Sequence, residues 1–178
     1  MNQFLRVPAE KKFLNELKAL SLRDARENAE IPPGWKLSPQ STLDFLMGHN
    51  KPVEGENSEE VTISAKYIGN RREIELCIAT LCSDRALMMI GPPGTGKSCV
   101  SEWLTAAISG TSRLILQGNS GVTEDQIKYS WNFSLLLQKG PTKEALKPSP
   151  IMLAMGLGQI IRFEEVTRCP QEVQDALI

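Results

Sequence analysis

The sequence predicts an α/β fold with a parallel sheet in a three-layer αβα arrangement, preceded by a small helical N-terminal arm. Two observations carry this prediction. Short apolar runs, each typical of a buried strand, alternate with segments whose apolar residues recur at helical spacing. The first of these runs leads directly into a glycine-rich turn. Strands separated by helices favour a parallel sheet with helices packed against it.

The composition is that of one ordinary domain with an added arm. The chain has 178 residues, of which 41% are hydrophobic and 23% charged, and its formal net charge is −1 at pH 7. There is enough apolar material for a core, and no basic excess points to nucleic acid. No run of about 18 apolar residues occurs, so no membrane helix is expected. Because the first ten residues also lack the apolar core of a secretory signal, we expect a cytoplasmic protein.

Four cysteines and one histidine are too few and too irregularly spaced for a common zinc site. We expect reduced and mostly buried thiols. These residues are Cys77, Cys82, Cys99, Cys169 and His49.

The helical arm is predicted over residues 1–50. Apolar residues recur at helical spacing over residues 9–30, and prolines and a glycine then end the pattern. A second, shorter helix is expected to begin at Pro39, with Ser38 as its N-cap.

A linker and a core are predicted after the arm. Residues 51–65 are assigned to the linker because this part of the chain is rich in glycine, proline, asparagine and glutamate, and residues 66–178 are assigned to the core. The predicted strands of the core are residues 86–90, 113–116 and 159–163. Its predicted helices are residues 70–82, 97–109, 123–139, 150–156 and 171–177.

The glycine-rich loop matches the pattern G-x-x-x-x-G-K-[ST], which binds the phosphates of nucleoside triphosphates. Glycines allow positive φ angles and let backbone N–H groups approach a phosphate closely. The following helix points its positive end at the same phosphates, Lys97 adds a charge, and Ser98 offers a hydroxyl to Mg²⁺. The residues predicted to bind the nucleotide are Gly91, Pro92, Pro93, Gly94, Thr95, Gly96, Lys97, Ser98 and Cys99.

Two adjacent glutamates, Glu164 and Glu165, follow the third predicted strand. An ATPase with this loop needs one carboxylate for the water shell of Mg²⁺ and a second to polarise the attacking water. We assign the metal role to Glu164 and the base role to Glu165, so that Lys97 and Glu165 are the predicted catalytic residues. The alternative is an acidic helix start, where glutamate is favoured by the helix dipole.

The two motifs and their flanks resemble the AAA+ ATPases, and most closely the MoxR-like branch. The resemblance is carried by G-P-P-G-T-G-K-S at residues 91–98 and by E-E-V-T-R-C-P at residues 164–170, which is similar to the branch's D-E-I-N-R-A-P. It extends over about residues 66–178 and leaves the first 65 residues without a counterpart. The resemblance implies MgATP held between the subunits of a ring, expected to be a hexamer, that remodels or assists the maturation of a client protein.

Two substitutions and one absence separate the sequence from the family pattern. Glu164 stands where the family has aspartate, and Thr167 stands where it has asparagine. The resemblance implies the sheet order 5-1-4-3-2, for which the chain supplies candidates for strands 1, 2 and 3. Strand 4 with its sensor asparagine, the arginine finger and the helical lid are expected beyond Ile178. We therefore expect the N-terminal part of a longer protein, with an incomplete AAA+ core.

Two further residues near the acidic pair have open assignments. Arg168 is either a contact to a neighbouring subunit, as the resemblance implies, or a surface residue beside a helix. Asn119 either holds Glu165 between cycles, as the resemblance to AAA+ proteins implies, or is an ordinary turn residue before Gly121.

Three aromatic or apolar positions are assigned to packing or to the adenine. Trp131 and Phe133 are expected in the core. The resemblance implies that Tyr67 or Ile68 lines the adenine pocket.

The sequence thus predicts ATP binding and hydrolysis by a MoxR-like AAA+ ATPase with Mg²⁺ as its metal. No N-K-x-D motif for reading guanine occurs, which favours ATP over GTP. The alternative is a truncated nucleotide-binding or partner-binding module without turnover.

Overall fold

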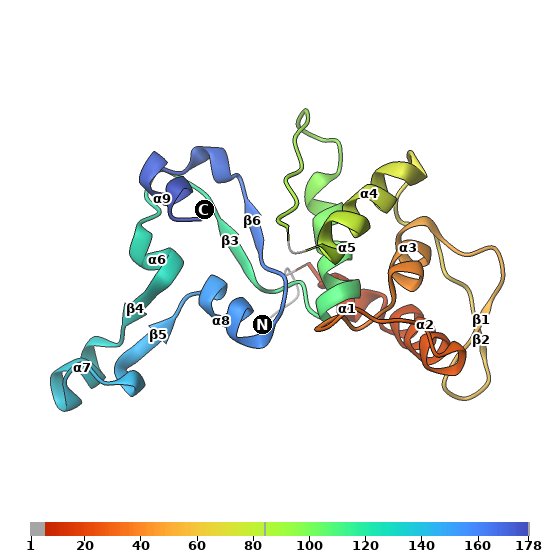
Figure 1. The fold of residues 1–178 in the computed structure, drawn as a ribbon, viewed down its shortest axis with the longest axis horizontal. Helices are drawn as coiled ribbons and strands as arrows, with labels where there is room; N and C mark the ends of the chain where they lie inside the picture. The colour runs from red at the N-terminus through yellow and green to blue at the C-terminus, as the bar shows by residue number, and fades with distance from the viewer. Residues whose placement is uncertain (1–5, 84, 178) are drawn as a thin grey trace. The chain divides into compact units, whose positions relative to one another are not determined.

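The structure, a computed structural model, describes residues 6–83 and 85–177 and divides into two units, Met1–Arg113 and Leu114–Ile178 (Figure 1). The predicted boundaries at residues 50 and 65 do not coincide with this division. The helices of the predicted arm and the helix after the glycine-rich loop belong to the same unit. Within the described residues, no helix is both long enough and apolar enough to cross a membrane.

The first unit is mainly helical. The predicted helix over residues 9–30 is present but interrupted at Phe13, whose φ of −112° and ψ of 28° depart from helical geometry. The predicted start of the second helix is confirmed: Pro39 is its first residue, and the Ser38 hydroxyl accepts the Ser41 N–H at 3.1 Å. The helices are α1 (Ala9–Lys12), α2 (Leu14–Glu27), α3 (Pro39–Met47), α4 (Arg71–Cys82) and α5 (Lys97–Ser109).

Helix α3 is central to the packing of the first unit. It packs against α2, α4 and α5, while α1 packs against α5. Because α3 meets other helices on several sides, its residues from Ser41 to Leu46 are all buried. The N-terminal helices therefore form one packed body with α5. The largest fully buried side chains of the unit include Leu20, Leu37, Phe45, Leu46, Ile63, Ile74, Leu104 and Ile108.

A buried polar network joins α2 to the start of α3. The carboxylate of Asp24, which is 2% exposed, accepts the N–H of Ser38 at 2.7 Å, the Ser38 hydroxyl at 2.8 Å and the Ser41 hydroxyl at 2.5 Å. Beside it, Arg23 donates to the Ser41 hydroxyl and pairs with Asp44, both at 2.7 Å. Asp24 therefore holds the N-cap residue of α3 from a neighbouring helix.

Replacement of Asp24 by alanine is expected to lower the free energy of unfolding by roughly 2–4 kcal/mol, because a helix cap and buried donors lose their acceptor. The urea midpoint of unfolding measures this loss. Asp125→Ala, at an exposed position in the second unit, is the control and should leave the midpoint nearly unchanged. Equal midpoints for the two variants would show that the network does not stabilise the fold.

The stretch predicted as a linker forms a small hairpin beside α2. Strands β1 (Val53–Glu54) and β2 (Glu60–Val61) pair antiparallel, with Val53 opposite Val61. Val53 is buried, both strands contact α2, and Arg26 of α2 pairs with Glu54 at 3.0 Å. The β-branched residues Val53 and Val61 thus form strands that pack against α2, which the composition of this stretch did not predict.

Lys66 ties the segment before α4 to the N-terminal helices. Its ammonium lies 2.6 Å from the Glu16 carboxylate and over the rings of Phe13 and Phe45, 4.6 and 4.1 Å from their centroids. Burial lowers the pKa of Lys66 below its ordinary value, although the Glu16 carboxylate opposes that shift.

The first predicted strand, residues 86–90, is not formed among the described residues. Residues 85–90 have no regular secondary structure and pair with no other described segment, and Met88 and Ile90 are 65% and 87% exposed. Figure 1 shows this segment within a loop that rises from the helices and returns to the start of α5. An apolar run becomes a strand only when a neighbouring strand accepts its backbone hydrogen bonds, and the described first unit supplies none at this place.

The second unit contains the predicted parallel pair of strands. Strands β3 (Ile115–Gln117) and β6 (Arg162–Glu164) pair parallel, with Gln117 opposite Glu164 (Figure 1). The predictions of strands at 113–116 and 159–163 are therefore confirmed, with the ladder shifted toward the C-terminus. Helix α9 (Gln171–Asp175) and the short η2 (Val166–Arg168) follow β6. A small core lies beside the strands and comprises Val122, Ile127, Cys169 and Val173, with Leu116 and Phe163 packed against it.

The single helix predicted over residues 123–139 is wrong. Helix α6 (Glu124–Lys128) is followed by strand β4 (Tyr129–Trp131), which pairs antiparallel with β5 (Leu146–Pro148). Between these strands lie α7 (Phe133–Lys139) and η1 (Lys143–Ala145), and α8 (Pro150–Leu157) follows β5. The aromatic residues of β4 favour a strand, and Asn132 then caps α7 by accepting the Leu135 N–H at 3.4 Å.

The described sheets are three separate strand pairs, one parallel and two antiparallel. The α/β class and the parallel pairing agree with the prediction, whereas the single sheet of a three-layer arrangement is not formed among the described residues.

Candidate nucleotide-binding site

The glycine-rich loop turns sharply between residues 85–90 and α5. Gly94 and Gly96 have φ angles of 82° and 81°, in the left-handed region that favours glycine. No atom lies within 4 Å of where a Cβ would stand on either residue, so both backbones face open space. The two glycines therefore allow the turn and leave room for a ligand against the backbone.

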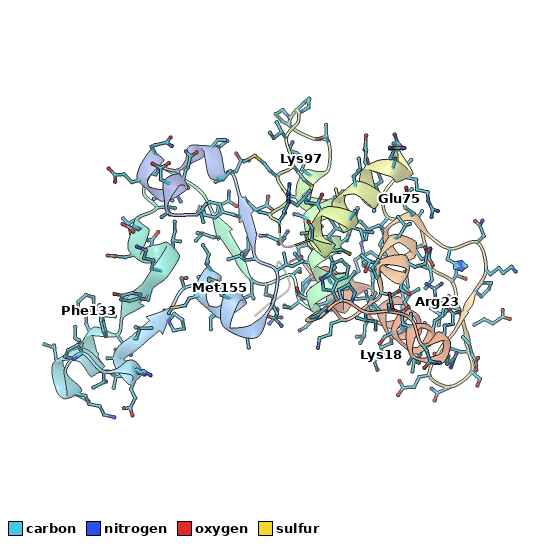
Figure 2. All side chains as sticks on the ribbon, in the orientation of Figure 1. Lys18, Arg23, Glu75, Lys97, Phe133 and Met155 are labelled. Atoms are coloured by element: carbon cyan, nitrogen blue, oxygen red, sulfur yellow. The ribbon has the colours of Figure 1, made fainter. Side chains whose placement is uncertain are left out.

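Lys97 folds back over this loop. Its ammonium donates to the carbonyl oxygens of Gly91 at 2.9 Å and Pro92 at 2.7 Å, and it lies 3.4 Å from the Thr95 hydroxyl. That hydroxyl in turn donates to the Pro92 oxygen at 3.0 Å. Figure 2 shows Lys97 where the loop meets α5. A phosphate bound in the turn would meet a positive charge already directed into it.

The start of α5 is suited to an anion. Gly96 is the N-cap and has no side chain that could accept the first N–H groups of the helix. The Gly96 carbonyl accepts the N–H groups of Cys99 and Val100, both at 3.0 Å, which begins the helical ladder. Ser98 stands exposed in this first turn. The positive end of the helix dipole and the Ser98 hydroxyl therefore lie at the same end of α5.

The acidic pair lies in the second unit, at the end of β6. Glu164 is partly buried, with Arg162 Nη1 3.4 Å from its Oε1, and its carbonyl accepts the Gly118 N–H at 2.8 Å. Glu165 has a φ of 54°, which is uncommon for a residue other than glycine, and its exposed carboxylate pairs with Arg168 at 3.1 Å. The backbone turn directs the two adjacent carboxylates into different surroundings.

Gly118 packs tightly under this turn and was not selected from the sequence. A Cβ on Gly118 would stand 2.4 Å from the Glu165 carbonyl oxygen and 2.9 Å from the Cys169 sulfur. Such distances require the backbone to move. Gly118 therefore permits the close approach of β3 to the turn that carries Glu165.

Replacement of Gly118 by alanine is expected to displace the Glu165 turn and to lower the free energy of unfolding by about 1–3 kcal/mol. Thermal unfolding measures this effect. Gly156→Ala is the matched control, because nothing lies within 4 Å of its Cβ position in α8 and alanine favours a helix. A melting temperature for Gly118→Ala equal to or above that of Gly156→Ala would contradict the packing described.

Asn119 and Arg168 have local partners in the structure. The Asn119 side chain accepts the Gly121 N–H at 2.8 Å and lies 3.4 Å from the Gln117 carbonyl, as in an ordinary turn. The described contacts of the Glu165 carboxylate go to Arg168 instead.

The aromatic and apolar residues singled out from the sequence are not buried in a packed core or pocket. They are Trp131, Phe133, Tyr67 and Ile68. Phe133 is 74% exposed (Figure 2), so its expected place in the core is wrong. Trp131 is only partly buried. The cause is the hairpin, which takes the segment away from the small core of the second unit. In the first unit, Ile68 is 96% exposed and the Tyr67 hydroxyl donates to the Glu73 carboxylate. That partner raises the pKa of Tyr67.

The described residues contain no preformed cluster of metal ligands. Within residues 6–83 and 85–177, no group of three or more histidine, cysteine, aspartate or glutamate residues could hold an ion by itself. Mg²⁺ that arrives with a nucleotide keeps most of its water and needs only one or two oxygen ligands from a protein.

The comparisons with known proteins place the glycine-rich loop within a domain of known family. Residues 86–178, just over half of the chain, match the AAA domain of the dynein-related subfamily. The chain belongs to this family of ATP-binding ATPases, whose members have the α/β fold of the P-loop NTPases. They bind their nucleotide typically with Mg²⁺, and they typically assemble as rings.

One curated relative extends the match to the N-terminal helices. Over 177 residues the chain is 44% identical to "Uncharacterized protein YehL" of Escherichia coli (strain K12), an alignment that covers 99% of this chain and 46% of that protein. The chain therefore spans about half the length of this relative. No solved structure matches the chain.

Proposed function

We propose that the protein to which this chain belongs is a MoxR-like AAA+ ATPase that hydrolyses MgATP. In this proposal it works as a ring, as a hexamer, and remodels or assists the maturation of a client protein. Nucleotide binding is proposed from the geometry of the glycine-rich loop. Gly94 and Gly96 are in the left-handed region, and Lys97, the first residue of α5, folds back over the loop. The membership of the AAA family supports the ring.

The residues of the loop have distinct roles in this proposal. In the loop at residues 91–99, every residue except Pro92 and Pro93 has a backbone N–H group, and these groups bind the phosphates. The Lys97 ammonium exchanges the Gly91 and Pro92 carbonyls for phosphate oxygens. The Ser98 hydroxyl and the Glu164 carboxylate would hold Mg²⁺ and its water. When bound, Mg²⁺ neutralises charge that develops on the phosphate oxygens.

Glu165 is the proposed base. Its carboxylate is exposed and carries a single described partner, Arg168, so it can accept a hydrogen bond from water once that pair opens. Because the backbone of Glu165 is in the left-handed region, its side chain points in a different direction from that of Glu164. This arrangement allows one carboxylate to serve the metal and the other to serve the water.

Steady-state phosphate release by the full-length protein tests this function. We expect release that requires Mg²⁺ and is faster with ATP than with GTP. Binding of ATP without Mg²⁺-dependent release would instead favour a nucleotide-binding module without turnover. Absence of both binding and release would contradict the proposed function.

A further inference from the structure

A buried glutamate lies on α5, one turn beyond the residues that meet the phosphates. Glu102 is 7% exposed, which is unusual for a charged side chain, and stands four residues after Ser98. Its Oε1 accepts the Ala9 N–H at 3.0 Å, and its Oε2 pairs with Arg6 at 2.9 Å. The nucleotide chemistry proposed above does not use this carboxylate.

The Ala9 N–H belongs to the first residue of α1 and has no other cap. The residue before it, Pro8, offers no side-chain acceptor, so the cap comes from α5. A carboxylate at a helix start also interacts favourably with the helix dipole. Glu102 therefore fastens the start of α1 to the first part of α5.

The position of the phosphate loop depends on where α5 is fastened. Residues 91–96 are exposed, and nothing lies near the Cβ positions of Gly94 and Gly96. Along α5 the first buried residues are Val100 and Glu102. The packing of the next helical turn, at Val100 and Glu102, therefore fixes the positions of Lys97 and Ser98 in the unit.

The N-terminal segment is fastened at a second point along α5. The Glu10 carboxylate accepts the Ser112 hydroxyl at 2.7 Å and the Ser112 N–H at 3.2 Å, just after α5 ends. Arg6 also lies 3.8 Å from the Cys99 sulfur, in the first turn of α5. Residues 6–10 thus follow α5 from its first turn to beyond its end, and they lie outside the residues that match the AAA domain.

We propose that Glu102 is a positioning residue for the phosphate site, through which residues 6–10 raise the affinity for the phosphates of the nucleotide. This inference rests on the proposed ATP binding. Sites that bind phosphate tolerate little displacement, and small shifts from remote changes can cost large factors in function. Coupling of this kind is reciprocal, so bound nucleotide must strengthen the Glu102–Ala9 contact by the same factor.

Calorimetric titration of the full-length protein with MgATP tests the inference through variants. Glu102→Ala is expected to weaken binding about tenfold by displacing the start of α5. Glu102→Gln keeps an oxygen that accepts the Ala9 N–H and should recover most of the affinity. Asp24→Ala is the matched control, since it removes another buried carboxylate of the same unit, whose described hydrogen bonds go to Ser38 and Ser41 at the start of α3. All titrations are made at a temperature where circular dichroism shows the variants folded.

Hydrogen exchange of the Ala9 amide in the unmodified protein supplies a readout that a structural role alone would not change. We expect MgATP to slow this exchange by about the factor by which Glu102→Ala weakens binding. Affinity of Glu102→Ala equal to that of the unmodified protein, or exchange at Ala9 that ignores MgATP, would overturn the positioning role while leaving ATP binding intact. No binding by the unmodified protein would instead overturn the proposed function itself.

Discussion

Replacement of Lys97 by alanine is expected to weaken MgATP binding on the order of 100-fold, since hydrogen bonds to charged groups contribute about 1.5–3 kcal/mol each and 1.4 kcal/mol corresponds to tenfold. The ammonium is the cation that the structure places over the loop, 2.7–2.9 Å from two of its carbonyls. Calorimetric titration with MgATP measures the change.

Lys143→Ala is the control for this variant. Lys143 is exposed in η1 of the second unit. The Lys143→Ala variant should therefore bind MgATP as tightly as the unmodified protein does. The phosphate role of Lys97 is refuted if the two alanine variants bind equally well. Comparison of their circular dichroism spectra shows whether either substitution affects folding.

Replacement of Glu165 by glutamine is expected to leave MgATP binding in place and to lower kcat by about 10²–10⁴, the usual contribution of a positioned base. The amide has nearly the same shape as the carboxylate but cannot take a proton from water. Phosphate release in a single turnover, measured beside binding, separates the chemical step from affinity.

Glu172→Gln is the matched control for Glu165→Gln. Glu172 is exposed in α9 of the same unit, and its replacement should not change kcat. A kcat for Glu165→Gln within twofold of the control would remove Glu165 from the proposed mechanism.

Local signals in the sequence predicted local structure well. The loop at residues 91–98 is defined by residues close to one another in sequence. Gly94 and Gly96 have the positive φ angles, and the following helix has the bounds, that the sequence predicts. The same holds for the start of α3, where the N-cap Ser38 directly precedes Pro39 and accepts the N–H of Ser41 three residues on. The parallel pairing of β3 with β6 also follows from strands separated by helices.

Features that depend on distant partners were missed. Residues 123–139 have helical character in sequence, but Tyr129–Trp131 pairs with residues 146–148, and the pairing decides the conformation. Residues 86–90 have strand character but no described partner, so no ladder forms. Glu102 could not be selected because its partners, Arg6 and Ala9, are more than 90 residues away in sequence, as the separation of 93 between Ala9 and Glu102 shows.

Calorimetric titration of the full-length protein with ATP, in the presence and absence of Mg²⁺, is the most direct test that the loop at residues 91–98 is a nucleotide site. We expect saturable binding that Mg²⁺ strengthens and that Lys97→Ala weakens on the order of 100-fold. Binding that is absent, or that is the same in the unmodified protein and in Lys97→Ala, would contradict the assignment of the loop as a nucleotide site.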